Sequence, residues 1–78
     1  MTIPDVFVDP ETGFASVVMF MPREDQWLGL DGKRYCMYYA IHDTKGVVTW
    51  GYTTKYRYAQ RNVKRLIKRR SKKHTVEV

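Results

Sequence analysis

Cys36, His42 and Asp43 are the three neighbouring residues whose types resemble a nucleophile with its base and orienting acid. A thiol nucleophile needs its base within hydrogen-bond reach. Cys36 and His42 fall on one face of a predicted strand but are six residues apart, and at roughly 3.3 Å per residue they are separated by about 20 Å. The other histidine, His74, falls in a predicted C-terminal tail. We therefore predict that these residues carry no catalysis.

The sequence shows no other arrangement typical of an active site. It contains no glycine-rich phosphate loop, no metal-spaced histidine cluster and no pair of carboxylates at catalytic spacing. The single cysteine excludes an internal disulfide and a multi-cysteine zinc site. We expect a protein that is not an enzyme and that uses no cofactor, no metal and no small-molecule substrate.

Basic residues near the C-terminus form the clearest pattern in the sequence. Apolar side chains recur at helical spacing and predict a helix over about residues 55–72, with Thr54 as its N-cap. The apolar stripe consists of Tyr56, Ala59, Val63, Leu66 and Ile67. The basic side chains on the other side are Arg57, Arg61, Lys64, Arg65, Lys68 and Lys72.

This predicted helix carries uncompensated positive charge, because no Asp or Glu occurs between Asp43 and Glu77. Each like-charge pair at i,i+3 or i,i+4 costs roughly 0.2–0.5 kcal/mol, and a solvated helix face normally mixes both signs. An anionic membrane is a weaker explanation, because the apolar stripe is narrow and is needed to cover the sheet. Contact with phosphates explains the pattern best.

The net charge of +6 is concentrated in the C-terminal part of the chain. Residues 1–31 carry six acids and one base, whereas residues 32–78 carry thirteen bases and two acids. Such asymmetry is typical of a protein that meets nucleic acid or an acidic protein. In the alternative, the acidic part packs on the basic part. Its acids lie mostly beside Pro and Gly in predicted turns, where they are poorly placed to cover a helix.

The 78 residues are expected to form one domain, 1–78, with a small core. The sequence shows neither a signal-peptide pattern nor an apolar run of membrane-spanning length. We therefore expect a cytoplasmic protein, in the host cytoplasm if a phage encodes it, without a membrane partner.

The hydrophobic pattern predicts an α+β fold. A small antiparallel β-sheet of three to four strands, arranged as a meander, packs against one C-terminal basic α-helix. The predicted strands cover about residues 5–8, 14–21, 34–42 and 47–53. Residues 22–33 form a loop that either folds over a core edge or exposes apolar side chains to a protein partner. Residues 74–78 form either an edge strand or a tail.

The register of the last predicted hairpin determines which large side chains are buried. A loop over residues 43–46 places three pairs of large residues on one face, where they form the core with the helix. These pairs are Ile41–Val48, Tyr39–Trp50 and Met37–Tyr52.

Aromatic residues of the same region allow a second interpretation, a stacking platform for unpaired bases. Its members would be Tyr35, Tyr39, Trp50 and Tyr52. The core interpretation is preferred, because a domain of this size needs its large side chains inside. Tyr38 lies on the opposite face, either half-buried or exposed as a contact.

Residues 33–70 also resemble a known module. The segments Arg34–Tyr39, Lys45–Gly46 and Trp50–Thr54 precede a predicted helix that contains Ala59, Val63 and Leu66. This order of residue types is similar to the arm-type DNA-binding domain of phage tyrosine recombinases, a three-stranded sheet with one helix. A similar plan occurs in the plant ethylene-response-factor DNA-binding domain.

In both families the sheet face away from the helix enters the major groove of DNA. The resemblance implies that this face would present Arg34, Tyr38, His42, Lys45 and Thr49 to DNA. The chain departs from the pattern in three ways: its basic charge lies mainly on the helix, residues 1–31 add a hairpin, and a catalytic recombinase domain is absent. These departures favour contact through the helix.

The sequence therefore predicts a small non-catalytic nucleic-acid-binding protein that contacts phosphates through its basic helix, with double-stranded DNA favoured over RNA. The alternative is a small inhibitor or interaction protein of the kind that phages encode. Such a protein would dock its basic face on an acidic surface of a host enzyme or nuclease.

Overall fold

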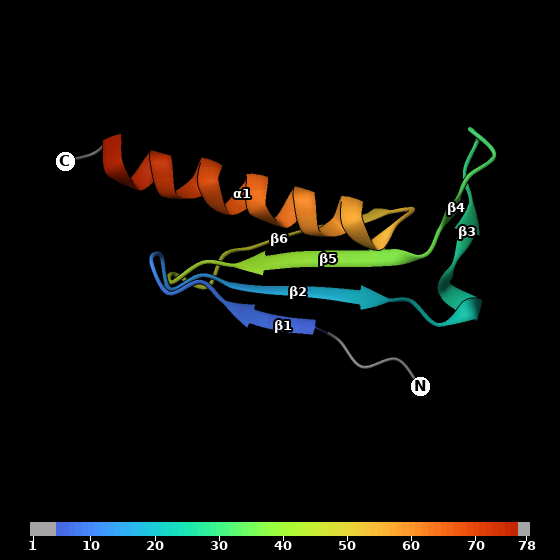
Figure 1. The fold of residues 1–78 in the computed structure, drawn as a ribbon, viewed down its shortest axis with the longest axis horizontal. Coiled ribbons are helices and arrows are strands. Elements are labelled where there is room, and N and C mark those ends of the chain that lie inside the picture. The colour runs from blue at the N-terminus through green and yellow to red at the C-terminus, as the bar shows by residue number, and fades with distance from the viewer. Residues whose placement is uncertain (1–4, 77–78) are drawn as a thin grey trace.

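The computed structural model describes residues 5–76, and the side chains of residues 5–71. Four antiparallel strands form the main sheet, and α1 (Tyr56–Val76) crosses one of its faces (Figure 1). The strands are β1 (Asp5–Val8), β2 (Ala15–Phe20), β5 (Met37–His42) and β6 (Val48–Thr53), in the spatial order β1-β2-β5-β6. The α+β fold with a meander and one C-terminal helix is confirmed.

Residues 22–35 form a small projecting unit rather than a flap over the core. After the short helix η1 (Arg23–Asp25), β3 (Trp27–Leu28) pairs with β4 (Arg34–Tyr35) in a second, two-stranded sheet. This hairpin lies beyond one end of the main sheet (Figure 1). Leu28 is 64% exposed and Leu30 is fully exposed. The predicted cover of a core edge is therefore wrong for these two leucines.

The register of the β5–β6 hairpin differs by one residue from the predicted register. Ile41 pairs with Thr49, Ala40 with Trp50 and His42 with Val48. The loop contains a tight turn, in which the Gly46 N–H donates to the Asp43 carbonyl, and Gly46 has a φ of +85°. The Asp43 N–H then donates to the Val47 carbonyl, which leaves a three-residue loop with glycine at its left-handed position.

This shift turns β6 over, because a one-residue slip moves every side chain of a strand to the other face. Trp50 is 58% exposed and Tyr52 is 39% exposed. The prediction that Val48, Trp50 and Tyr52 belong to the core is wrong. They lie on the sheet face away from α1, which we call the outer face.

The core lies between α1 and the middle of the main sheet. Val18, Met37 and Ile41 pack against Ala59 and Val63 of the helix, with Leu66 and Ile67 at the margin. Gly51 faces this layer, and the Tyr39 ring lies over it so closely that a β-carbon at Gly51 would be 2.5 Å from the Tyr39 hydroxyl oxygen. Gly51 on β6 therefore leaves room for the ring of Tyr39 on β5.

The ends of α1 differ from the prediction in two details. The helix begins at Tyr56, and the Lys55 carbonyl accepts from the N–H groups of Tyr58 and Ala59. Lys55, not Thr54, therefore flanks its first turn. At the other end α1 continues to Val76, so residues 74–76 are helical and form neither a strand nor a tail. Residues 77–78 lie outside the described part.

Candidate nucleic-acid interface

The crest of α1 carries a continuous line of basic side chains. Ala59 and Val63 turn toward the sheet, and the residues at the complementary helical positions turn toward solvent. We call the exposed set the basic row; it consists of Arg57, Arg61, Lys64, Arg65 and Lys68. All five were predicted as site residues and all five are exposed. The sixth, Lys72, belongs to α1, but its side chain lies outside the described part.

The basic row is long enough to contact several phosphates of a DNA strand. With a rise of 1.5 Å per residue, the distance along the axis from Arg57 to Lys68 is about 16 Å. One strand of duplex DNA carries a phosphate for about every 3.4 Å along the duplex axis. Because the strand winds around that axis, only some of the phosphates within this length face the helix. A row of this kind can neutralise several phosphates at once.

Tyr58 lies at the start of the row among three cations. The guanidinium carbons of Arg57 and Arg61 are 5.4 Å and 5.5 Å from the centre of its ring, and the Lys55 ammonium is 5.8 Å away. A ring face attracts cations through its quadrupole. The ring thus stabilises the three cations at the start of the helix, where no acid of the first turn compensates their charge.

The two tyrosines of this first turn have opposite pKa shifts. Hydrogen bonding from Arg57, followed by the charge of Lys55, lowers the pKa of Tyr58. Tyr56 donates its hydroxyl hydrogen to the Asp5 carboxylate, and this bond raises the pKa of Tyr56. Cations stabilise a phenolate, whereas a hydroxyl that donates to an anion resists deprotonation.

We predict that Tyr58 ionises at a lower pH than Tyr56 in the folded protein. In alkaline titrations followed by phenolate absorbance, the component that Tyr58→Phe removes should have a lower midpoint than the component that Tyr56→Phe removes. The reverse order of the two midpoints would contradict this prediction.

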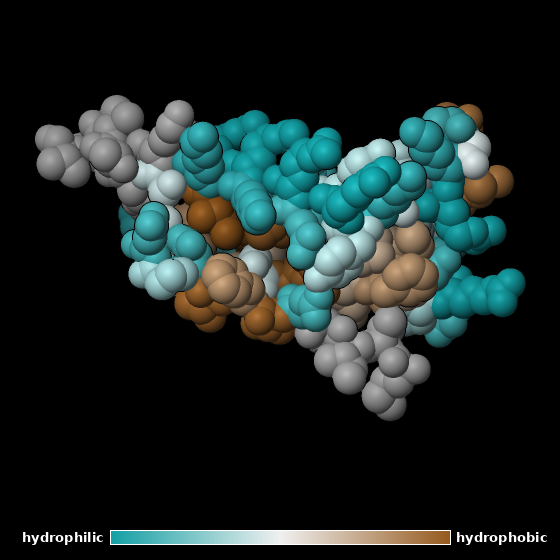
Figure 2. Space-filling view, viewed as in Figure 1, coloured by the Kyte–Doolittle hydropathy of each residue, from teal (hydrophilic) through white to brown (hydrophobic). Residues whose placement is uncertain are grey.

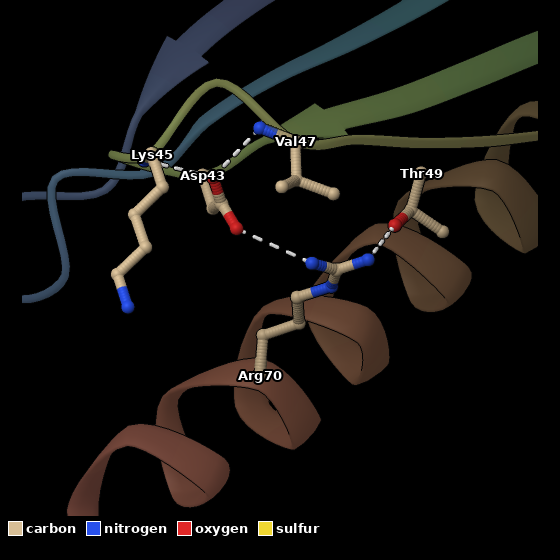
Figure 3. Close-up of polar contacts among 5 residues, drawn as sticks. All are labelled: Asp43, Lys45, Val47, Thr49 and Arg70. Carbon is tan, nitrogen blue, oxygen red and sulfur yellow. Dashed lines mark hydrogen bonds and ion pairs between the residues drawn. The ribbon is translucent and has the colours of Figure 1, made fainter.

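Arg70 belongs to a structural contact and not to the basic row (Figure 3). Its Nη1 donates to Asp43 Oδ2 at 3.2 Å, and its Nη2 donates to the Thr49 hydroxyl. The Asp43 side chain is only 4% exposed, and its Oδ1 accepts from the N–H groups of Lys45 and Val47 at 2.8 and 2.9 Å. This contact fastens the last described turns of α1 to the β5–β6 loop.

Thr49, which the resemblance placed on the DNA-facing side of the sheet, lies on the helix side. It is half-buried and bonded to Arg70. Its predicted place on the face opposite the helix is therefore wrong, and the one-residue shift in the register of β6 is the cause. Lys45 is exposed in the loop, with its ammonium directed away from the Asp43 carboxylate in Figure 3.

The other predicted sheet residues lie near the outer face or its ends. Tyr38 and His42 alternate with the buried Met37 and Ile41 on β5, so they point to the outer face. Tyr38 is half-buried and His42 is exposed. Arg34 is exposed on β4 of the projecting hairpin.

A groove separates α1 from β1. Its lining shows how the acidic part of the chain lies relative to the basic part. Its volume is about 570 Å³. Asp5, Asp9 and Glu11 line one wall, and Lys64 and Lys68 line the other. Figure 2 shows a hydrophobic band between the hydrophilic surface of α1 and the strands below it. Between described side chains the one ion pair is Arg70–Asp43, so no acid of residues 5–31 forms an ion pair with the basic row.

Five aromatic side chains meet in space, and sequence reasoning named only Tyr35, Trp50 and Tyr52 of them as a possible platform. Tyr52 is 4.9 Å from Trp27, 5.7 Å from Tyr38 and 5.5 Å from Trp50, measured between ring centroids. Tyr35 stacks on Trp27 at 5.3 Å with an interplanar angle of 1°. We call this set the aromatic cluster. Its members come from both sheets, so only the three-dimensional arrangement brings them together.

Among the described side chains, those of residues 5–71, no group of three or more metal-ligating residues is close enough to hold a metal ion. Within residues 5–76, no helix combines the length and the apolar character that crossing a membrane requires. Comparisons with protein-family models, with curated proteins and with solved structures found no match.

Proposed function

We propose that this protein binds nucleic acid, with the basic row of α1 contacting the phosphates of double-stranded DNA. The observation that carries the proposal is a row of five exposed bases on the helix crest. No ion pair joins any of them to a described acid. The apolar stripe on the other side of the same helix packs into the core. The cost of keeping these like charges together is offset when phosphates lie against them.

A salt titration tests this proposal. A site that engages four to six phosphates should give a slope of log affinity against log salt of about −4 to −5 on duplex DNA. Replacing Arg65 and Lys68 together by Gln should reduce the magnitude of that slope by about two and weaken all sequences alike. The fold should survive, because both side chains are exposed and their removal relieves repulsion.

The matched control is Arg23→Gln, which removes an exposed base from η1 and not from α1. It should leave the slope unchanged. An unchanged slope in the double variant would remove the basic row from the binding surface. Absence of duplex binding by the wild type at low salt would contradict the proposal itself.

A second candidate is an interaction protein that docks on an acidic surface of another protein. The exposed Leu28 and Leu30 on the projecting hairpin favour it, because apolar side chains gain from burial against a protein and not from contact with phosphates. Failure of the wild type to bind DNA, together with capture by an acidic partner that Leu30→Ser abolishes, would support this candidate.

A further inference from the structure

The outer face of the main sheet is apolar and aromatic and has no helix over it. Its outward positions contain no carboxylate in any of the four strands. These positions are Val6, Val8, Ala15, Val17, Met19, Tyr38, Ala40, His42, Val48, Trp50 and Tyr52. A face without negative charge does not repel a polyanion, and the exposed Arg34 and Lys45 lie beyond its two ends.

The aromatic cluster occupies the end of this face next to the projecting hairpin. Trp50, Trp27 and Tyr52 are 58%, 41% and 39% exposed, although each ring touches another ring. Their neighbours hold them at fixed angles: Trp27 and Trp50 both meet Tyr52 edge-to-face, at 78° and 74°. The rings are therefore preorganised and still offer free surface.

From this arrangement we infer that the aromatic cluster binds the unpaired bases of single-stranded nucleic acid. Each base presents a π-face, and stacking on an aromatic side chain is worth about 1–3 kcal/mol per base without demanding a particular sequence. The basic side chains of Arg34 and Lys45, at the two ends of the face, can contact the phosphates between the stacked nucleotides. Nucleic acid is favoured over an apolar protein surface because the exposed rings lie at a sheet face whose outward positions hold no carboxylate. Asp31 of the projecting hairpin lies beside the cluster and accepts from the Tyr35 hydroxyl at 3.4 Å.

This second surface is distinct from the basic row, because the sheet lies between them. The inference takes from the proposed function only that the partner is nucleic acid. If both surfaces bind, the protein contacts a duplex on one side of its sheet and an unpaired strand on the other.

Two probes distinguish the surfaces: a labelled oligodeoxythymidine 12-mer and a 12-base-pair duplex of mixed sequence, both titrated by anisotropy. Trp50→Ala should weaken binding of the single strand by about 5- to 150-fold, which corresponds to the loss of one stacked base. The same variant should leave duplex affinity within about twofold. The Arg65→Gln/Lys68→Gln variant should show the opposite preference and lose mainly duplex affinity.

Intrinsic tryptophan fluorescence gives an independent readout, because the only two tryptophans, Trp27 and Trp50, both belong to the cluster. Single-strand binding should quench it. Val48→Ala, on the same strand and the same face, is the matched control and should bind the single strand like the wild type. Circular dichroism confirms that each variant is folded.

Three results would overturn the inference alone. The first is a wild type that binds the duplex but neither binds the single strand nor shows quenching; the proposed function then survives alone. The second is Trp50→Ala that binds the single strand as tightly as the wild type. The third is a wild type that self-associates in sedimentation while Trp50→Ala stays monomeric, which would assign the outer face to a second copy of the chain. Absence of binding to both probes would overturn this inference and the proposed function together.

Discussion

Ile41→Ala should destabilise the protein by about 3–4 kcal/mol, while Trp50→Ala should cost less than about 1 kcal/mol. Ile41 is 1% exposed and packs within the core cluster, so truncation removes buried methyl groups and leaves a cavity. Trp50, although much larger, is 58% exposed on the outer face, and substitutions at exposed positions have small effects.

Urea denaturation followed by circular dichroism measures both values. A domain of this length typically has a free energy of unfolding of roughly 4–12 kcal/mol, so Ile41→Ala removes a large part of it and should lower the Tm by about 15–25 °C. Ile41→Val, which removes one methylene, is the graded control and should cost about 1 kcal/mol. A Trp50→Ala variant as unstable as Ile41→Ala would mean that β6 presents its other face to the helix.

Asp43→Ala is expected to cost about 3 kcal/mol, although Asp43 belongs to a loop. Its carboxylate accepts from two loop N–H groups and from Arg70, and its side chain is nearly inaccessible. Truncation leaves the loop donors and the Arg70 guanidinium without this acceptor, and an unsatisfied buried group costs about 1–3 kcal/mol.

Asp43→Asn is the matched control, because its amide oxygen can still accept from Lys45 and Val47 while the charge opposite Arg70 is lost. We expect it to cost about 1 kcal/mol. Chemical denaturation of the two variants, with Arg70→Gln beside them, separates the loop bonds from the ion pair. If Asp43→Ala unfolds like the wild type, the contact in Figure 3 does not stabilise the fold.

Features of this fold that depend on local spacing could be predicted from the sequence. The i,i+3 and i,i+4 recurrence of Ala59, Val63, Leu66 and Ile67 identified the helix and the stripe that it packs on the sheet, and the basic row follows from the same geometry. The strands predicted over 5–8, 14–21 and 47–53 lie within one residue of the observed β1, β2 and β6, whereas the strand predicted over 34–42 is divided into β4 and β5, which belong to different sheets. The exposure of the row was thus predictable, whereas its partner remains a proposal.

The errors have two physical causes. β3 and β4 contain two residues each, which is too short for alternation to show. The β5–β6 register depends on how many residues close the loop, and Asp43-Thr44-Lys45-Gly46 fits a four-residue loop as well as a three-residue loop with glycine at the left-handed position. That ambiguity placed Trp50 in the core and concealed the aromatic cluster.

The three-residue loop between Asp43 and Val47 also bears on which changes of chain length the protein tolerates. Surface loops commonly gain or lose residues without harm. If one residue were deleted here and the loop kept three residues by shifting the register of β6, Tyr52 would take the place of Gly51 and point at the helix, where the Tyr39 ring already fills the space. A change of loop length can therefore disturb the core through the register, and we expect related chains to vary this loop by substitution more often than by insertion or deletion.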